Sequence, residues 1–151
     1  MSQPMASFID NDDESNQAIA DKIVAYFNDR DDGSYAAIVS ETRPKAVGAG
    51  MVKTVHNCRG RYIRVWKQLK SPEPLKLQLK GSTLSALVKG LILEHDNCAA
   101  IYVALQEVLG GYWSAVKDNG DVGIAYSHDE SISFKKLKVG EGIWTVWRYP
   151  R

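Results

Sequence analysis

The stretch that decides the fold is Arg61–Leu69, RYIRVWKQL, followed by Leu75–Lys80, LKLQLK. Apolar and polar residues alternate in both runs, and alternation places successive side chains on opposite faces of a β-strand. Residues 70–74, KSPEP, supply turn-forming residues between the two runs. We therefore expect a β-hairpin in which one face is apolar and the other face is basic and aromatic.

On the outer face of this expected hairpin, aromatic rings stand beside Lys and Arg side chains. Single-stranded DNA or RNA is bound by such a combination, because bases stack on the rings while the cations hold phosphates. The alternative interpretation is that the rings of Tyr62 and Trp66 are buried under another segment, since large aromatic residues are usually buried. The predicted nucleic-acid-binding residues are Lys53, Arg59, Arg61, Tyr62, Arg64, Trp66, Lys76 and Lys80.

Helices are expected on both sides of the hairpin. Apolar residues from Asn16 to Asn28 recur at helical spacing, as they do again from Leu84 to Ile92 after Ser82 or Thr83 as N-cap. A further helix is predicted from an Asn97 cap to the Gly110-Gly111 stop, with its apolar stripe on Cys98, Ile101, Tyr102, Leu105, Val108 and Leu109.

Short β-branched and aromatic runs predict the remaining strands. The expected strands are Tyr35–Ser40, Tyr112–Val116, Val122–Tyr126, Ile132–Val139 and Ile143–Tyr149, while 43–50 is expected to be a loop or an irregular edge. The fold class predicted is α+β, with antiparallel sheets packed against two or three amphipathic helices. Residues 1–14 are polar and acidic and predict a disordered tail, which leaves 15–151 as a single domain.

Charge is strongly segregated along the 151 residues. Nine acids and two bases occur in Met1–Glu41, a net charge of −7, whereas Thr42–Leu93 has eleven bases and one acid, a net charge of +10. Such a basic segment favours a polyanionic partner. Two other interpretations stay open: the two segments could neutralise each other in the fold, or the basic segment could dock on an acidic partner protein.

The region Met51–Leu93 resembles the single-stranded-DNA-binding domain of the positive cofactor four transcriptional coactivators. The matching elements are Arg59-Gly60-Arg61 leading into Tyr62–Trp66, and Lys80-Gly81-Ser82-Thr83-Leu84 opening a helix. An acidic segment before the domain, here Asp10–Glu14, is also similar to that family. The resemblance implies a homodimer whose curved, basic sheets bind unpaired strands with little sequence preference.

Near the C-terminus a second aromatic and basic cluster comprises Phe134, Lys135, Lys136, Lys138, Trp144, Trp147, Arg148 and Tyr149. It could extend the binding surface or close the core. The tryptophans alternate with Ile143 and Val146 in a run with few polar residues, which favours the core.

Catalytic and metal chemistry have little support in the sequence. Phosphate-loop, nucleophile-elbow and HExxH motifs are absent, so a non-catalytic protein without a cofactor is expected. A nuclease or transferase whose site is assembled from residues far apart in sequence stays open as the alternative. His56-x-Cys58 and His95-x-x-Cys98 could together surround a zinc ion, but the spacing is poor for a structural zinc site. With two cysteines, no signal peptide and no long apolar run, we expect an intracellular protein that does not enter a membrane.

Overall fold

A computed structural model describes residues 5–30, 34–51, 56–71, 73–95, 97–126 and 132–149. Within these ranges the chain has three α-helices and two four-stranded antiparallel sheets, so the α+β prediction is confirmed. The chain divides into two compact units, each with one of the sheets. Unit 1 comprises Met1–Pro44, Gly50–Gln68 and Gly120–Ser127, and unit 2 comprises Lys45–Ala49, Leu69–Asn119 and His128–Arg151.

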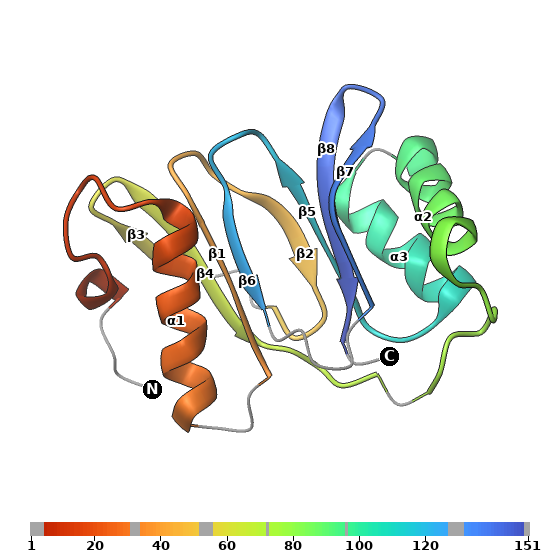
Figure 1. Cartoon of the computed structure of the whole chain (residues 1–151), viewed down its shortest axis with the longest axis horizontal. Coiled ribbons are helices and arrows are strands. Elements are labelled where there is room, and N and C mark those ends of the chain that lie inside the picture. The colour runs from red at the N-terminus through yellow and green to blue at the C-terminus, as the bar shows by residue number, and fades with distance from the viewer. Residues whose placement is uncertain are drawn as a thin grey trace. The chain divides into compact units, whose positions relative to one another are not determined.

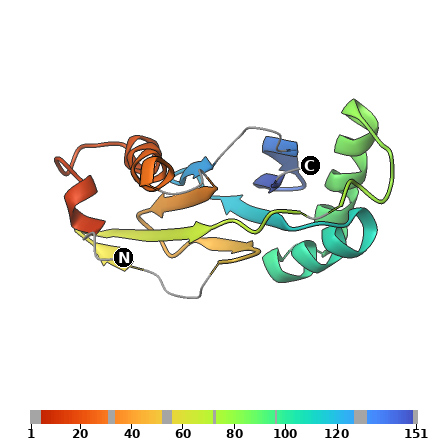
Figure 2. The same ribbon diagram turned by 90° about the horizontal axis from the view of Figure 1, so that it is seen from below.

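Unit 1 is a sheet in the order β3-β4-β1-β6, covered on one face by helices (Figures 1 and 2). Its elements are the 3-10 helix η1 (Met5–Phe8), α1 (Asn16–Arg30), β1 (Tyr35–Ser40), β3 (His56–Cys58), β4 (Arg61–Lys67) and β6 (Gly123–Tyr126). The apolar stripe of α1 packs on alternate residues of the strands. The core contains Ile19, Ile23, Phe27, Ala37, Val39, Ile63 and Ala125.

The first turn of α1 is attached to the edge strand β6. The Gln17 side-chain amide donates to the Ile124 carbonyl oxygen at 2.7 Å and accepts from the Ile124 backbone N–H at 3.0 Å. A Cβ atom at Gly123 would lie 2.3 Å from the backbone of Asn16, so only glycine allows this approach. The side chain of Gln17 thus satisfies two backbone groups at the edge of the sheet.

Unit 2 is a second sheet, in the order β2-β5-β8-β7. Its elements are β2 (Lys45–Gly48), α2 (Gly81–His95), α3 (Cys98–Leu109), β5 (Trp113–Asp118), β7 (Ile132–Val139) and β8 (Gly142–Arg148). In this unit α3 packs over β2 and β5, while α2 packs over β7 (Figure 1). The core between helices and sheet includes Val88, Ile92, Ile101, Leu105, Leu109, Trp113, Trp144 and Val146.

A buried arginine connects the end of α3 to the last strand. Arg148 is 0% exposed, and its Nε donates to the carbonyl oxygen of Gly110 at 2.9 Å. Burial lowers the pKa of the Arg148 guanidinium. Gly111 has a φ of +88°, and a Cβ there would lie 2.2 Å from Arg148 Nε, so this turn needs glycine for conformation and for space. Arg148 therefore has a structural role.

Most elements expected from local patterns are present. Helix α1 begins at Asn16 as predicted, and α3 has the predicted Asn97 cap, whose side chain accepts from the Ala100 N–H. Strand β2 is a short edge strand within the segment expected to be a loop or an irregular edge. One difference is β6, which pairs with β1 and not with the other C-terminal strands.

The expected hairpin is wrong in its second half, because Leu75–Lys80 is not a strand. Strand β4 is hydrogen-bonded to β1 on one side and to β3 on the other, so its backbone groups are already paired. Lys76 instead donates its backbone N–H to the Leu109 carbonyl oxygen at 2.8 Å. Segment 75–80 is therefore hydrogen-bonded to the C-terminal end of α3 and belongs to unit 2, whereas β4 belongs to unit 1.

Much of the segment expected to be a disordered tail packs on unit 1. Met5, Phe8 and Ile9 are buried in the core of this unit, and Phe8 packs edge-on against Tyr26 with ring centroids 5.3 Å apart. A single 3-10 turn is too short to produce a hydrophobic period, which is why the sequence pattern did not indicate it. Residues 1–4 lie outside the described ranges.

Candidate nucleic-acid interface

Strand β4 has the predicted alternation of faces but not the predicted open face. Ile63 and Val65 point toward the α1 side, so Tyr62, Arg64 and Trp66 occupy the opposite face. Trp66 is only 3% exposed, and a ring with so little accessible surface cannot stack on a base. Tyr62 and Arg64 are half-buried. The aromatic platform expected on this strand is therefore reduced to part of one tyrosine ring.

The two arginines that lead into β4 bind the acidic N-terminal segment. Arg59 forms an ion pair with Asp12 at 2.8 Å and also donates to the Ile9 carbonyl oxygen at 2.9 Å. Arg61 is 5% exposed and donates to the carbonyl oxygens of Asp12 at 2.8 Å and Glu14 at 2.6 Å. In unit 1 these predicted ligand-binding residues instead hold segment 9–14 against the sheet.

A further ion-pair cluster fixes the same acidic segment on α1. Lys22 Nζ lies 2.5 Å from Glu14 Oε2 and 3.0 Å from Asp10 Oδ2. The hydrogen bond from Lys22 lowers the pKa of the Glu14 carboxyl below its ordinary value of 4.5. Lys22 belongs to the acidic segment Met1–Glu41 itself, so the neutralisation considered for the two oppositely charged segments occurs inside unit 1 at the Arg59–Asp12 ion pair, whose residues are distant in sequence.

Two of the remaining predicted site residues, Lys76 and Lys80, do not belong to the unit that contains β4. Lys76 Nζ donates to the Glu107 carbonyl oxygen at 3.2 Å, so this lysine caps the C-terminal turn of α3. Lys80 is exposed at the entry to α2. Lys53 lies outside the described residues. Lys76 and Lys80 belong to unit 2, whereas Arg59 through Trp66 belong to unit 1.

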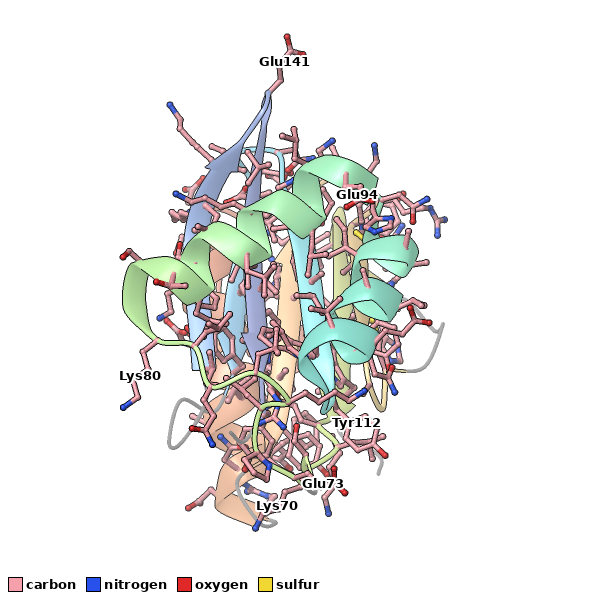
Figure 3. The ribbon with its side chains drawn as sticks, turned by 90° about the vertical axis from the view of Figure 1, so that its right-hand side faces the viewer. Lys70, Glu73, Lys80, Glu94, Tyr112 and Glu141 are labelled. Carbon is pink, nitrogen blue, oxygen red and sulfur yellow. The ribbon has the colours of Figure 1, made fainter. Side chains whose placement is uncertain are left out.

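Unit 2 has a group of exposed lysines that the hairpin hypothesis did not include, although three of them belong to the C-terminal cluster noted in the sequence. We call this group the basic flank: Lys80, Lys89, Lys135, Lys136 and Lys138. Lys80 directly precedes α2, Lys89 lies on α2, and the other three lysines lie on β7. Helix α2 and strand β7 pack against each other through apolar residues. Figure 3 shows Lys80 where the chain enters α2, Glu94 near the other end of this helix and Glu141 at the tip of the β7–β8 hairpin.

Few carboxylates oppose the basic flank among the described residues. Lys136 forms an ion pair with Asp118 at 3.1 Å, but Lys80, Lys89 and Lys138 form none within the described ranges. In sequence terms unit 2 has eleven bases and eight acids, a net charge of +3, while unit 1 has eight bases and ten acids, a net charge of −2. Unit 2 is therefore the more basic unit.

The C-terminal tryptophans close the core, as favoured by their pattern. Trp144 is 1% exposed and Trp147 is 0% exposed. The aromatic part of this cluster is thus largely structural, and its exposed part is Lys135, Lys136 and Lys138.

The described residues hold no group of three or more His, Cys, Asp or Glu side chains that could bind a metal. His56 and Cys58 lie in unit 1, whereas His95 and Cys98 lie in unit 2. Burial raises the pKa of the Cys98 thiol, so this cysteine stays protonated at neutral pH. Across the described ranges, none of the helices is long and apolar enough to cross a bilayer.

No protein-family model, curated protein sequence or solved structure matches this chain. The resemblance of Met51–Leu93 to positive cofactor four therefore stays a prediction.

Proposed function

We propose that the chain is a non-catalytic nucleic-acid-binding protein in which the basic flank of unit 2 binds the phosphates. The observation that carries this proposal is the presence of four exposed lysines on α2 and β7, which pack together, and of the exposed Lys80 directly before α2. Lysine ammonium groups bind phosphates as point charges and release the counterions that surround a nucleic acid. The first turn of α2 contains no acidic residue, so its exposed N–H groups add to the positive potential near Lys80.

This proposal differs from the hairpin hypothesis in the kind of interaction. Trp66 is buried, and Arg59 and Arg61 are engaged within unit 1, so base stacking on β4 has no part in it. Phosphate binding is independent of base sequence and follows the charge density of the nucleic acid. We therefore expect a duplex to bind at least as tightly as a single strand of the same length, because a duplex carries more phosphates per unit length.

The experiment is a salt titration of a fluorescein-labelled dT20 oligonucleotide and of a 20-base-pair duplex, followed by fluorescence anisotropy. The double variant Lys89→Gln/Lys138→Gln removes two charges of the basic flank that form no ion pair within the described ranges. Each lysine that no longer binds a phosphate should reduce the slope of log Kd against log salt by about 1, so we expect a reduction of about 2. The matched control, Lys45→Gln/Lys70→Gln, removes two exposed lysines of the same unit outside the flank and should leave the slope unchanged.

Three results would overturn the proposal. Failure of both probes to bind at low salt would favour an acidic protein partner for these lysines. Equal weakening of binding by the control pair and the flank pair would show that the attraction is diffuse. A flank variant that binds normally yet aggregates would mean that the lysines only protect the edge strand β7 from pairing with other chains.

A further inference from the structure

The outer side of the α2–α3 helix pair contains a groove that the proposed function does not use. Its lining comes from the last turn of α2 and from most of α3, all within unit 2. The cavity measures about 630 Å³. Residues that define it are Leu91, Glu94, Ala100, Val103, Ala104 and Glu107.

The floor of the groove is apolar and composed mainly of small side chains. Ala99, Ala100 and Ala104 lie on one side of α3, and small residues at such spacing let another backbone approach closely. Val103 stands beside them and is 49% exposed, although apolar residues of its size are usually buried. From Asn97 to Val108 the floor extends for about 16 Å at 1.5 Å per residue, roughly three helical turns.

The rim of the groove is acidic, in contrast to the rest of unit 2. Glu94 is exposed near the end of α2 and Glu107 is exposed near the end of α3. Neither carboxylate forms an ion pair within the described ranges, and the nearby Lys76 donates to the carbonyl oxygen of Glu107 and not to its carboxylate. Among the described residues, the exposed His95 is the only basic side chain of the lining, which contains no lysine or arginine. A partner complementary to this rim has to be basic.

We infer that this groove docks an amphipathic α-helix of another protein, with an apolar stripe of Leu and Ala and with Lys or Arg on its flanks. A helix in a groove buries its apolar stripe on the floor while its flanking cations meet the rim carboxylates. The surface is separate from the basic flank, which repels such a helix. The inference does not depend on nucleic-acid binding, and either function can fail without the other.

The test uses a fluorescein-labelled 14-residue peptide with Leu and Ala on one helical stripe and Lys on both flanks, titrated with the full chain. A peptide of the same composition in scrambled order is the first control. We expect saturable binding of the amphipathic peptide and no binding of the scrambled one. The variant Glu94→Lys/Glu107→Lys should weaken binding by about tenfold or more, because attraction is replaced by repulsion at two positions.

The control variant is Glu141→Lys, which makes the same kind of charge change at another exposed glutamate of unit 2. Figure 3 shows Glu141 at the tip of the β7–β8 hairpin, away from Glu94. This variant should bind the peptide as the parent chain does, apart from a uniform salt-dependent decrease. A Glu-flanked version of the peptide should in turn bind the Glu94→Lys/Glu107→Lys chain better than it binds the parent.

The steric variant Ala100→Trp provides a second readout, since it fills the groove while leaving all charges in place. We expect it to abolish peptide binding with little change in the thermal melt, because Ala100 is half-exposed on the helix surface. Equal binding of the scrambled peptide, equal weakening in both charge variants, or unchanged binding by Ala100→Trp would overturn the inference. So would a dimer in sedimentation velocity that the Glu94→Lys/Glu107→Lys change dissociates, because the groove would then hold a second copy of this chain.

Discussion

Units 1 and 2 contain similar sheets with helices on one face, but they use their charged residues differently. In unit 1 the cations Lys22, Arg59 and Arg61 bind carboxylates or carbonyl oxygens of the segment 9–14. In unit 2 the basic flank extends from α2 and β7, where Lys136 pairs with Asp118 while Lys80, Lys89 and Lys138 form no ion pair within the described ranges. A basic segment of sequence therefore does not by itself identify a basic surface, because its cations can form ion pairs and hydrogen bonds within the folded chain.

The same comparison explains why the tryptophans give no stacking platform. Trp66 of unit 1 and Trp113, Trp144 and Trp147 of unit 2 are all less than 4% exposed. Four large rings thus contribute apolar area to the interior, where each stabilises the fold through burial and packing. The difference between the units lies in their surface cations and not in the exposure of their tryptophans.

The largest effect should come from Trp66→Ala, which tests whether β4 is structural. Removing a buried tryptophan leaves a cavity, so we expect a decrease of about 3–5 kcal/mol in the free energy of unfolding. Binding of dT20 below the melting temperature should not change. Thermal melts by circular dichroism and anisotropy titrations measure the two quantities. A stable variant with weakened dT20 binding would instead restore the stacking role of this strand.

An intermediate effect is expected from Arg61→Ala, which tests the internal use of charge in unit 1. The substitution leaves the carbonyl oxygens of Asp12 and Glu14 without this donor, so the free energy of unfolding should fall by about 1–3 kcal/mol. The matched change Arg59→Ala breaks a more exposed ion pair, for which we expect less than about 1 kcal/mol. Urea denaturation of the two variants and the parent chain measures the difference.

Hydrogen exchange of residues 5–14 gives an independent measurement of these two variants. Exchange should become faster with Arg61→Ala than with Arg59→Ala, because Arg61 holds two carbonyl oxygens of the segment from a buried position. The opposite order would mean that Arg59 is the main attachment of this segment.

The smallest effect should be the acid dependence of unit 1. The pKa of Glu14 is lower in the folded chain than the ordinary 4.5, so its contribution to stability is present above about pH 4.5 and is lost as the pH falls through the folded value. We expect Glu14→Gln to lower the melting temperature at pH 7, and we expect its difference from the parent chain to shrink as the pH falls from 4.5 through the lower folded pKa. A difference that stays constant over this pH range would show that the ionised carboxylate contributes nothing.

Sequence patterns predicted the local elements well, and the reason is periodicity. Helix α3 has an Asn97 cap, an apolar stripe and a glycine stop, and all three signals act within a few residues. The alternation in Arg61–Lys67 likewise predicted which side chains of β4 share a face. The same alternation in Leu75–Lys80 predicted a strand that does not form. Strand β4 already has two neighbours, and a further strand would need a free edge to pair with.

By itself the sequence determined the α+β class, the helical segments, the faces of β4 and the core position of the C-terminal tryptophans. Only the tertiary structure decided that β6 pairs with β1, that Met5 and Phe8 join the core, and that Arg59 and Arg61 bind the acidic segment. The physical reason is the distance along the sequence between the residues that interact. A period or a cap depends on residues a few positions apart, whereas burial, strand pairing and charge neutralisation depend on which distant segments compete for the same face or hydrogen-bonding group.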